Sequence, residues 1–153
     1  MDANLVNPFI EATLNVLETT ASTEASAGTP YIKTEPTASG SITGVIELSG
    51  EFKATIAVSF NKEGILAIVS KMFGEELSEL NDEIKDAVGE ISNMISGQAT
   101  NSIAGLGDSL KAKLSTVILE ENHTIPHIGR FPVVAFPFTI PSGAFTIELC
   151  FKK

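Results

Sequence analysis

Regular alternation of side-chain character between residues 41 and 60 constrains this fold more than any other sequence feature. Ile, Leu or Gly occupies every second position in residues 42–48, and apolar residues do the same in residues 54–60. Because successive side chains of a strand point to opposite faces, the pattern predicts an antiparallel hairpin with one buried and one wetter face. Gly44 interrupts the aliphatic series, and we expect it to mark a β-bulge.

Three later segments also have the composition of strands. Residues 144–151 alternate cleanly and predict a second half-buried strand, and residues 114–119 predict another. Residues 131–140 are rich in strand formers but contain Pro132 and Pro137, so we expect this segment at an edge or a bend.

Three segments have the apolar spacing of amphipathic helices. They are residues 4–19, 62–73 and 82–104. Asn61 and Asn81 precede the second and third segments and are suited to cap them. We expect the second helix to end at Gly74 and the third near Gly105 or Gly107.

The order of the elements is helix, strands, two helices, strands. Residues 20–29 are small and polar and predict a mobile connection, whereas residues 31–33 predict a short strand. An apolar face on every clear strand favours an α+β fold, with an antiparallel sheet covered on one face by helices. We expect residues 1–153 to form a single domain, since chains of this length bury about two-thirds of their unfolded surface.

The third helical segment carries a candidate site on the side opposite its apolar stripe. Asp86, Glu90 and Asn93 share that side, and at about 100° per residue Glu90 and Asn93 lie one turn apart. Gly89 and Gly97 lie within the same segment, where each costs about 1 kcal/mol against alanine and so suggests a close approach to the backbone. An acid and an amide on such a face indicate a functional site, although a plain solvated face has the same pattern.

Residues 86–93, DAVGEISN, resemble the Asp/Ser-x-x-x-Glu-x-x-Asn signature of the CheC/CheX/FliY family of chemotaxis phosphatases. The single copy on a short chain is most similar to the CheX branch, and the order of elements agrees over nearly the whole chain. The resemblance implies a phosphatase that dephosphorylates a phosphorylated CheY-type response regulator. It implies that Asn93 orients the attacking water and that Glu90 pairs with a lysine of the partner. We expect Asp86, Gly89 and Gly97 to contact that partner.

The resemblance also implies where the metal of the reaction is bound and how the chain assembles. Mg²⁺ is expected on the response regulator, with no cofactor or metal bound by this chain, and a homodimer joined through the sheets is expected. A rival hypothesis is a non-catalytic adaptor that binds a response regulator without hydrolysis. It is favoured by Thr116, which stands where the family often has proline. A third hypothesis is an unrelated structural α+β protein.

Composition and charge exclude several other functions. A net charge of −9 disfavours nucleic acid and anionic membrane surfaces, both of which need clustered lysine and arginine. The lone Cys150 rules out an internal disulfide, and without a signal peptide or a spanning segment we expect a cytoplasmic protein. His123 and His127 have no cysteine or carboxylate cluster to complete a metal site, so we expect structural or surface histidines. No Ser-His-Asp or Cys-His arrangement is evident.

Overall fold

The computed structural model describes residues 3–50, 53–103, 110–128 and 133–152. The helices in these segments are α1 (Ala3–Ala21), α2 (Lys62–Phe73) and α3 (Asp82–Ser102). The strands are β1 (Ser26–Ala27), β2 (Tyr31–Lys33), β3 (Ile42–Ser49), β4 (Lys53–Phe60), β5 (Lys111–Leu119), β6 (Val133–Ile140) and β7 (Gly143–Lys152).

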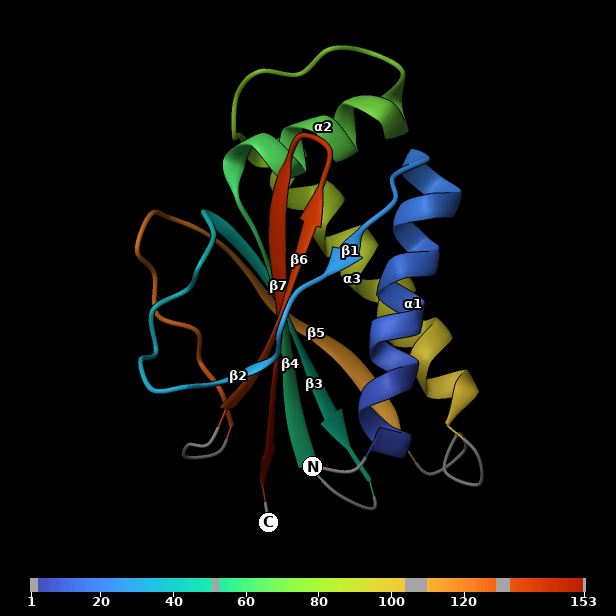
Figure 1. Cartoon of the computed structure of the whole chain (residues 1–153), viewed down its shortest axis with the longest axis vertical. Coiled ribbons are helices and arrows are strands. Elements are labelled where there is room, and N and C mark those ends of the chain that lie inside the picture. Colours follow the sequence, from blue (N-terminus) through green and yellow to red (C-terminus); the bar gives the residue numbers. More distant parts are fainter. Residues whose placement is uncertain (1–2, 51–52, 104–109, 129–132, 153) are drawn as a thin grey trace.

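One antiparallel sheet contains these strands in the order β1-β6-β7-β4-β3-β5, with β2 also paired to β6. Helices α1 and α3 lie side by side on one face of the sheet, and α2 lies at one end (Figure 1). The connections 34–41 and 120–128 run along the opposite face (Figure 1). The predicted α+β class, with helices on one face of an antiparallel sheet, is confirmed.

The hairpin of β3 and β4 forms as the alternation predicts, in continuous register along both strands. The expected wetter face is confirmed only at one end of the hairpin, where Glu47, Ser49 and Lys53 are exposed, because the connections 34–41 and 120–128 cover the rest of that face. Thr43 and Thr55 there are only 0% and 1% exposed, and Glu148 of β7, also predicted half-buried, is 1% exposed. Polar side chains can be buried when hydrogen bonds satisfy them. The alternation therefore predicts which face of the hairpin is more apolar, but it does not predict how much of the other face is covered by loops.

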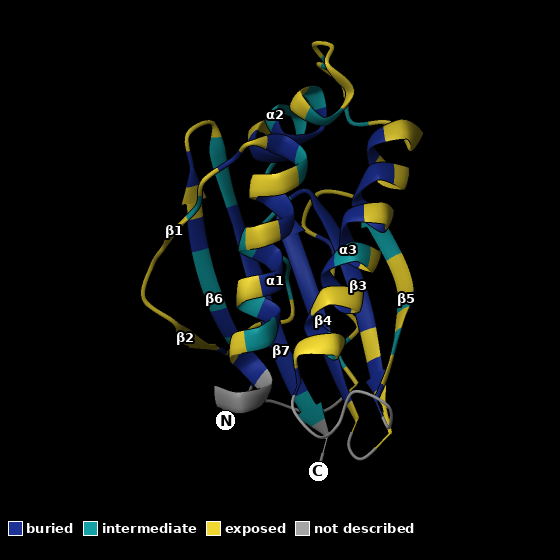
Figure 2. Ribbon diagram, turned by 90° about the vertical axis from the view of Figure 1, so that its right-hand side faces the viewer, coloured by how far each residue is buried: buried dark blue, intermediate teal, exposed yellow. Residues whose placement is uncertain are grey.

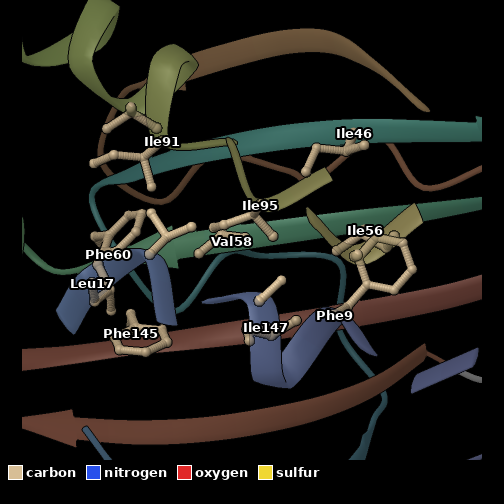
Figure 3. Close-up of a cluster of buried hydrophobic side chains, with 14 of the residues drawn as sticks. Phe9, Leu17, Ile46, Ile56, Val58, Phe60, Ile91, Ile95, Phe145 and Ile147 are labelled. Atoms are coloured by element: carbon tan, nitrogen blue, oxygen red, sulfur yellow. The ribbon is translucent and has the colours of Figure 1, made fainter. Parts of the chain in front are cut away.

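The main core fills the space between the helices and the sheet (Figure 3). Three of its aromatic rings pack together, with Phe145 at 5.6 Å from Phe60 and at 5.0 Å from Phe138 between ring centroids. Phe9 and Leu17 of α1 and Ile91 and Ile95 of α3 point into the same core (Figure 3). Burial of these side chains fixes both helices on the sheet, at about 1.5–3 kcal/mol for each large apolar group.

Both predicted asparagine caps are present. The Asn61 side chain accepts a hydrogen bond from the Gly64 backbone N–H at 2.8 Å, and Asn81 accepts one from Ile84 at 3.1 Å. α2 ends at Gly74, whose φ of 68° is the left-handed conformation that glycine favours. These caps fix where α2 and α3 begin.

The end of α3 differs from the prediction. The helix stops at Ser102, and Ile103 is already extended with φ −79° and ψ 109°. Gly105 and Gly107, which were expected near the end, lie outside the described residues. Ile103 nevertheless remains in the core, at 5% exposure.

The segments that flank β6 also combine a correct and an incorrect prediction. The short strand at residues 31–33 is confirmed as β2, but residues 20–29 include β1, which pairs with β6. β6 is the second strand from the edge, and Pro137 lies opposite the gap between β1 and β2, where its missing N–H breaks no ladder bond. Pro132 lies outside the described residues.

Candidate functional site

Helix α3 has one side buried against the sheet and the other side exposed (Figure 2). Ile84, Val88, Ile91 and Ile95 are all at most 1% exposed. The predicted site residues Asp86, Glu90, Asn93 and Gly97 are exposed on the other side of the helix, whereas Gly89 is buried. The structure therefore brings the predicted acid and amide together on one accessible face.

A groove of about 460 Å³ runs between α3 and β5 beside this face. Its lining residues come from both elements and are Lys85, Asp86, Gly89, Glu90, Asn93, Leu114 and Val117. Gly97 lies outside the lining, one turn beyond Asn93 on the same exposed face. Four of the five predicted site residues therefore line one groove. No sequence pattern predicts that Lys85, Leu114 and Val117 belong to this site.

A bulge in β5 supplies the apolar floor of this groove. Val45 of β3 pairs with Thr116 and Ile46 pairs with Leu114, so Ser115 is an extra residue in β5. The extra residue reverses the alternation, which places both Leu114 and Val117 toward α3. Thr116 is exposed and does not line the groove.

The glycines have different roles from those expected. Gly44 is not a bulge, since it pairs regularly with Val58 and Val117. A Cβ at Gly89 would meet Leu114 Cδ2 at 3.4 Å and Val117 Cγ2 at 3.7 Å, which are ordinary contacts, and one at Gly97 would meet nothing within 4 Å. A close approach within this chain therefore explains neither glycine of α3, and their contact with a partner remains a prediction.

The amide and the carboxylate at the groove are available to an incoming molecule. Among the described residues, neither the Asn93 amide nor the Glu90 carboxylate makes a hydrogen bond or an ion pair. On α1, by contrast, the Asn15 amide already donates to Gln98 Oε1 at 2.8 Å. Lys85 is the one cation among the lining residues, beside the carboxylates of Asp86 and Glu90.

Both histidines are structural, as one of the two expectations stated. His123 Nε2 lies 2.6 Å from Thr43 Oγ1, and His127 Nδ1 lies 2.6 Å from Thr55 Oγ1. These bonds fasten the 120–128 connection to the sheet. Within the described segments, no group of three or more His, Cys, Asp or Glu side chains could bind a metal ion.

The face of the sheet that the 120–128 connection covers also holds a buried polar network, which no sequence pattern predicts. Glu148 of β7 accepts hydrogen bonds from Lys33 Nζ at 2.7 Å and from His127 Nε2 at 3.1 Å. Because a carboxylate only accepts, Nε2 carries the proton and Nδ1 can accept from the Thr55 hydroxyl. Thr55, His127 and Glu148 thus resemble a nucleophile-base-acid chain, but Thr55 and Glu148 are each 1% exposed and the Thr55 oxygen also accepts from the Ile128 N–H. The network is structural.

The fold and the groove together indicate a protein that acts on another macromolecule. An antiparallel α+β framework presents a free amide and a free carboxylate on an open helix face, whereas small-molecule sites are usually enclosed and largely apolar. Such a site suits the surface of another macromolecule. Among the described residues, no helix combines the length and apolar character that crossing a bilayer would require.

Comparison with known proteins gives the particular family. The family model described as "Chemotaxis phosphatase CheX" matches residues 42–139, which include the whole groove, and the chain belongs to this family. The crystal structure of a chemotaxis protein CheX from Desulfovibrio desulfuricans is 37% identical, covers 97% of this chain and 99% of its own, and superposes with a TM-score of 0.86. The family that residues 86–93 predict is confirmed.

Two further relatives match most of the chain. The CheY-P phosphatase CheX of Thermotoga maritima is 26% identical over 140 residues, which are 89% of this chain and 90% of that protein. The structure of a CheX–CheY–BeF3–Mg²⁺ complex from Borrelia burgdorferi has the same fold, with a TM-score of 0.75 at 19% identity over 97% of this chain and 98% of that chain.

Proposed function

We propose that this protein is a phosphatase that hydrolyses the aspartyl phosphate of a CheY-type response regulator. The observation that carries the proposal is the uncommitted Glu90 and Asn93 pair in an open groove. Membership of the chemotaxis phosphatase family supports it, as does the name of the Thermotoga relative. The Borrelia complex supports a CheY-type partner.

Asn93 orients the attacking water in this proposal. Its amide oxygen accepts a hydrogen bond from the water, and its amide N–H donates to a phosphoryl oxygen. The water oxygen forms the new bond to phosphorus while the bond to the aspartyl oxygen breaks, and a proton from the water passes to a phosphoryl oxygen. The leaving carboxylate has an ordinary pKa of about 3.9, so it needs no general acid and a neutral amide is sufficient.

Glu90 pairs with a lysine of the response regulator and fixes the depth of α3 in the partner's site. A carboxylate free of other partners can form this charge-assisted bond without first breaking one. Asp86, one turn before Glu90, and Gly97, one turn after Asn93, extend the contact along the same face. Gly89 leaves room beside the floor of the groove.

Mg²⁺ belongs to the response regulator in this scheme. Asp86 and Glu90 are the groove's only carboxylates, and hard divalent cations prefer six or more oxygen ligands. Bound to the partner, Mg²⁺ would neutralise phosphoryl charge, and this chain's own residues position the water. The encounter takes place in the cytoplasm, and the chain acts there as a homodimer joined through its sheets.

The test is the lifetime of the acyl phosphate on a phosphorylated CheY-type protein with Mg²⁺. Asn93→Ala should lower the stimulated rate about 100-fold or more, as loss of a positioned donor typically does, with binding of the BeF3-loaded regulator retained. Glu90→Ala should weaken binding and rate together. Asn15→Ala, on the exposed face of α1, is the matched control and should act like the parent.

Two outcomes would overturn the proposal. The first is an Asn93→Ala variant as fast as the parent. The second is a parent chain that binds the BeF3-loaded regulator but leaves the acyl-phosphate lifetime unchanged, which would establish the non-catalytic adaptor.

A further inference from the structure

Helix α3 lies directly against the sheet at Gly44 of β3. A Cβ at this position would overlap Ser92 Oγ and would lie 3.3 Å from both Ser92 Cβ and Val88 Cγ1. Contacts of 3.3 Å are already tight for a real side chain, and an overlap with Oγ cannot be accommodated without movement. Only glycine therefore lets α3 lie at its present depth on β3.

Ser92 is held in place on its own side of this contact. Its side chain is 0% exposed, and its hydroxyl donates to the Val88 carbonyl at 2.7 Å. Rotating the hydroxyl away would break that bond inside a close-packed core. The hydroxyl of Ser92 therefore fits a notch that the absent side chain of Gly44 leaves in the sheet.

Side chains of β5 limit the rotation of the helix. Gly89 lies about 60° around the helix from Ser92, and a Cβ added there would meet Leu114 Cδ2 at 3.4 Å and Val117 Cγ2 at 3.7 Å. The notch at Gly44 and the side chains of β5 beside Gly89 border α3 at different angles, and together they limit both its depth and its rotation. Asn93 follows Ser92 directly, about 100° around the axis, so any rotation or lift at Ser92 moves its amide.

We propose that Gly44 is a positioning residue, which sets the depth and rotation of α3 so that Asn93 and Glu90 project correctly into the groove. The inference rests on the proposed phosphatase function for its consequence, but its geometry is independent of it. Gly44 acts through Ser92 and touches neither the partner nor the phosphoryl group. The absence of a side chain at Gly44, on the buried side of α3, thus aligns Asn93 and Glu90 on its exposed side.

The test is a double-mutant cycle between Gly44→Ala and Ser92→Ala. Gly44→Ala should lower kcat about 10- to 100-fold, since a 1 Å misplacement can cost about 100-fold, while KM for the phosphorylated regulator changes much less. Ser92→Ala alone adds no bulk and should stay within about threefold of the parent. The double variant removes the overlapping oxygen, leaves only the 3.3 Å contacts, and should regain most of the lost rate.

A control separates positioning from lost stability. Ile56→Val removes a buried methyl group of β4, outside the notch, and should lower the melting temperature without lowering kcat. Three results would each overturn the inference: Gly44→Ala with full kcat, a double variant no faster than Gly44→Ala, or an equal loss of kcat in Ile56→Val at a similar melting temperature.

The same variants distinguish failure of this inference from failure of the proposed function. If even the parent chain leaves the acyl phosphate untouched, the proposed function fails. NMR then decides the positioning: the Asn93 side-chain amide and Glu90 backbone signals should shift in Gly44→Ala and return in the double variant. Signals that stay in place in Gly44→Ala would overturn the inference whatever the activity.

Discussion

A polar residue on a helix can act on a partner only if its own chain has not already used its hydrogen-bonding groups. Asn15 and Asn93 are both exposed on helices that cover the same face of the sheet. The Asn15 amide is occupied by Gln98, whereas the Asn93 amide makes no hydrogen bond with the described residues. Exposure can be inferred from helical spacing, but this difference depends on which helix lies alongside, and no local pattern encodes it.

The first prediction concerns the charge of the Glu90 side chain. Glu90→Gln keeps the size of the side chain but loses the ion pair that we propose with the partner's lysine. We expect kcat/KM to fall about tenfold, as for loss of a charge-assisted bond of about 1.5 kcal/mol, with a smaller effect on kcat. Asp86→Asn neutralises the other acid of the groove, also without a change of size, and serves as the comparison.

Ionic strength provides the measurement that separates charge from shape. Between about 0.05 and 0.5 M salt, kcat/KM of the parent should decline because exposed charges are screened. The Glu90→Gln variant should decline less steeply. Parallel salt profiles for the two proteins would contradict an ion pair at this position.

The Lys33–Glu148 pair gives a second prediction at the residue scale. Lys33→Met would leave the Glu148 carboxylate, 1% exposed, with His127 as its one remaining hydrogen-bond donor among the described residues. Breaking a buried ion pair on one side typically costs about 3–5 kcal/mol, and we expect a loss near the lower figure because His127 remains. The free energy of unfolding in urea measures it, with exposed Lys53→Met as control. A loss no larger than the control's would show that the pair contributes little.

Within single helices and strands, the features that sequence predicts are those that depend on residues close together along the chain. The helices α2 and α3 begin where Asn61 and Asn81 predict, and the period-two segments are strands. Glu90 and Asn93 share a face because helical geometry alone requires it. The fold class followed from the order of these local patterns.

What could not be predicted depends on residues far apart in sequence. The cover over the second face of the sheet comes from residues 34–41 and 120–128, and Lys33 and Glu148 are separated by 115 positions. Gly44 was misread as a bulge because a glycine within a strand also marks close packing, and only the position of Ser92 distinguishes the two. The real bulge, at Ser115, has no glycine to indicate it.

That bulge gives a prediction for β5. A regular strand would direct Leu114 and Thr116 to the same side, whereas the bulge directs Leu114 and Val117 toward α3. Val117→Asn should therefore lower the free energy of unfolding by about 1–3 kcal/mol and weaken binding of the regulator, because it places an amide against Gly89. Thr116→Asn, one residue earlier and exposed, should change both by little. The reverse ranking in urea unfolding and regulator binding would mean that β5 is regular.

The whole molecule has two different sheet edges. On one side, β5 presents the exposed Lys111 and Lys113, and lysines on an edge oppose pairing with a second copy. On the other side, β2 carries Tyr31 and Ile32, which are 45% and 65% exposed and are among the largest exposed apolar side chains of the described residues. An isologous dimer needs a self-complementary patch. Apolar side chains can face their own copies across such an interface, whereas lysines that face their own copies repel. The β2 edge is therefore the one through which we expect the sheets to join.

This expectation gives the prediction for the assembly. Ile32→Lys places a charge on the proposed interface and should shift the proposed dimer toward monomer, lowering the mass measured by light scattering after gel filtration. Phe73→Lys changes another exposed apolar residue, 43% exposed at the end of α2, and should leave the mass unchanged. Since the α3 groove lies beside β5, at the far side of the sheet from β2, the Ile32→Lys monomer should still hydrolyse the acyl phosphate. A parent that is monomeric at micromolar concentration, or a dimer that Ile32→Lys leaves intact, would contradict joining through this edge.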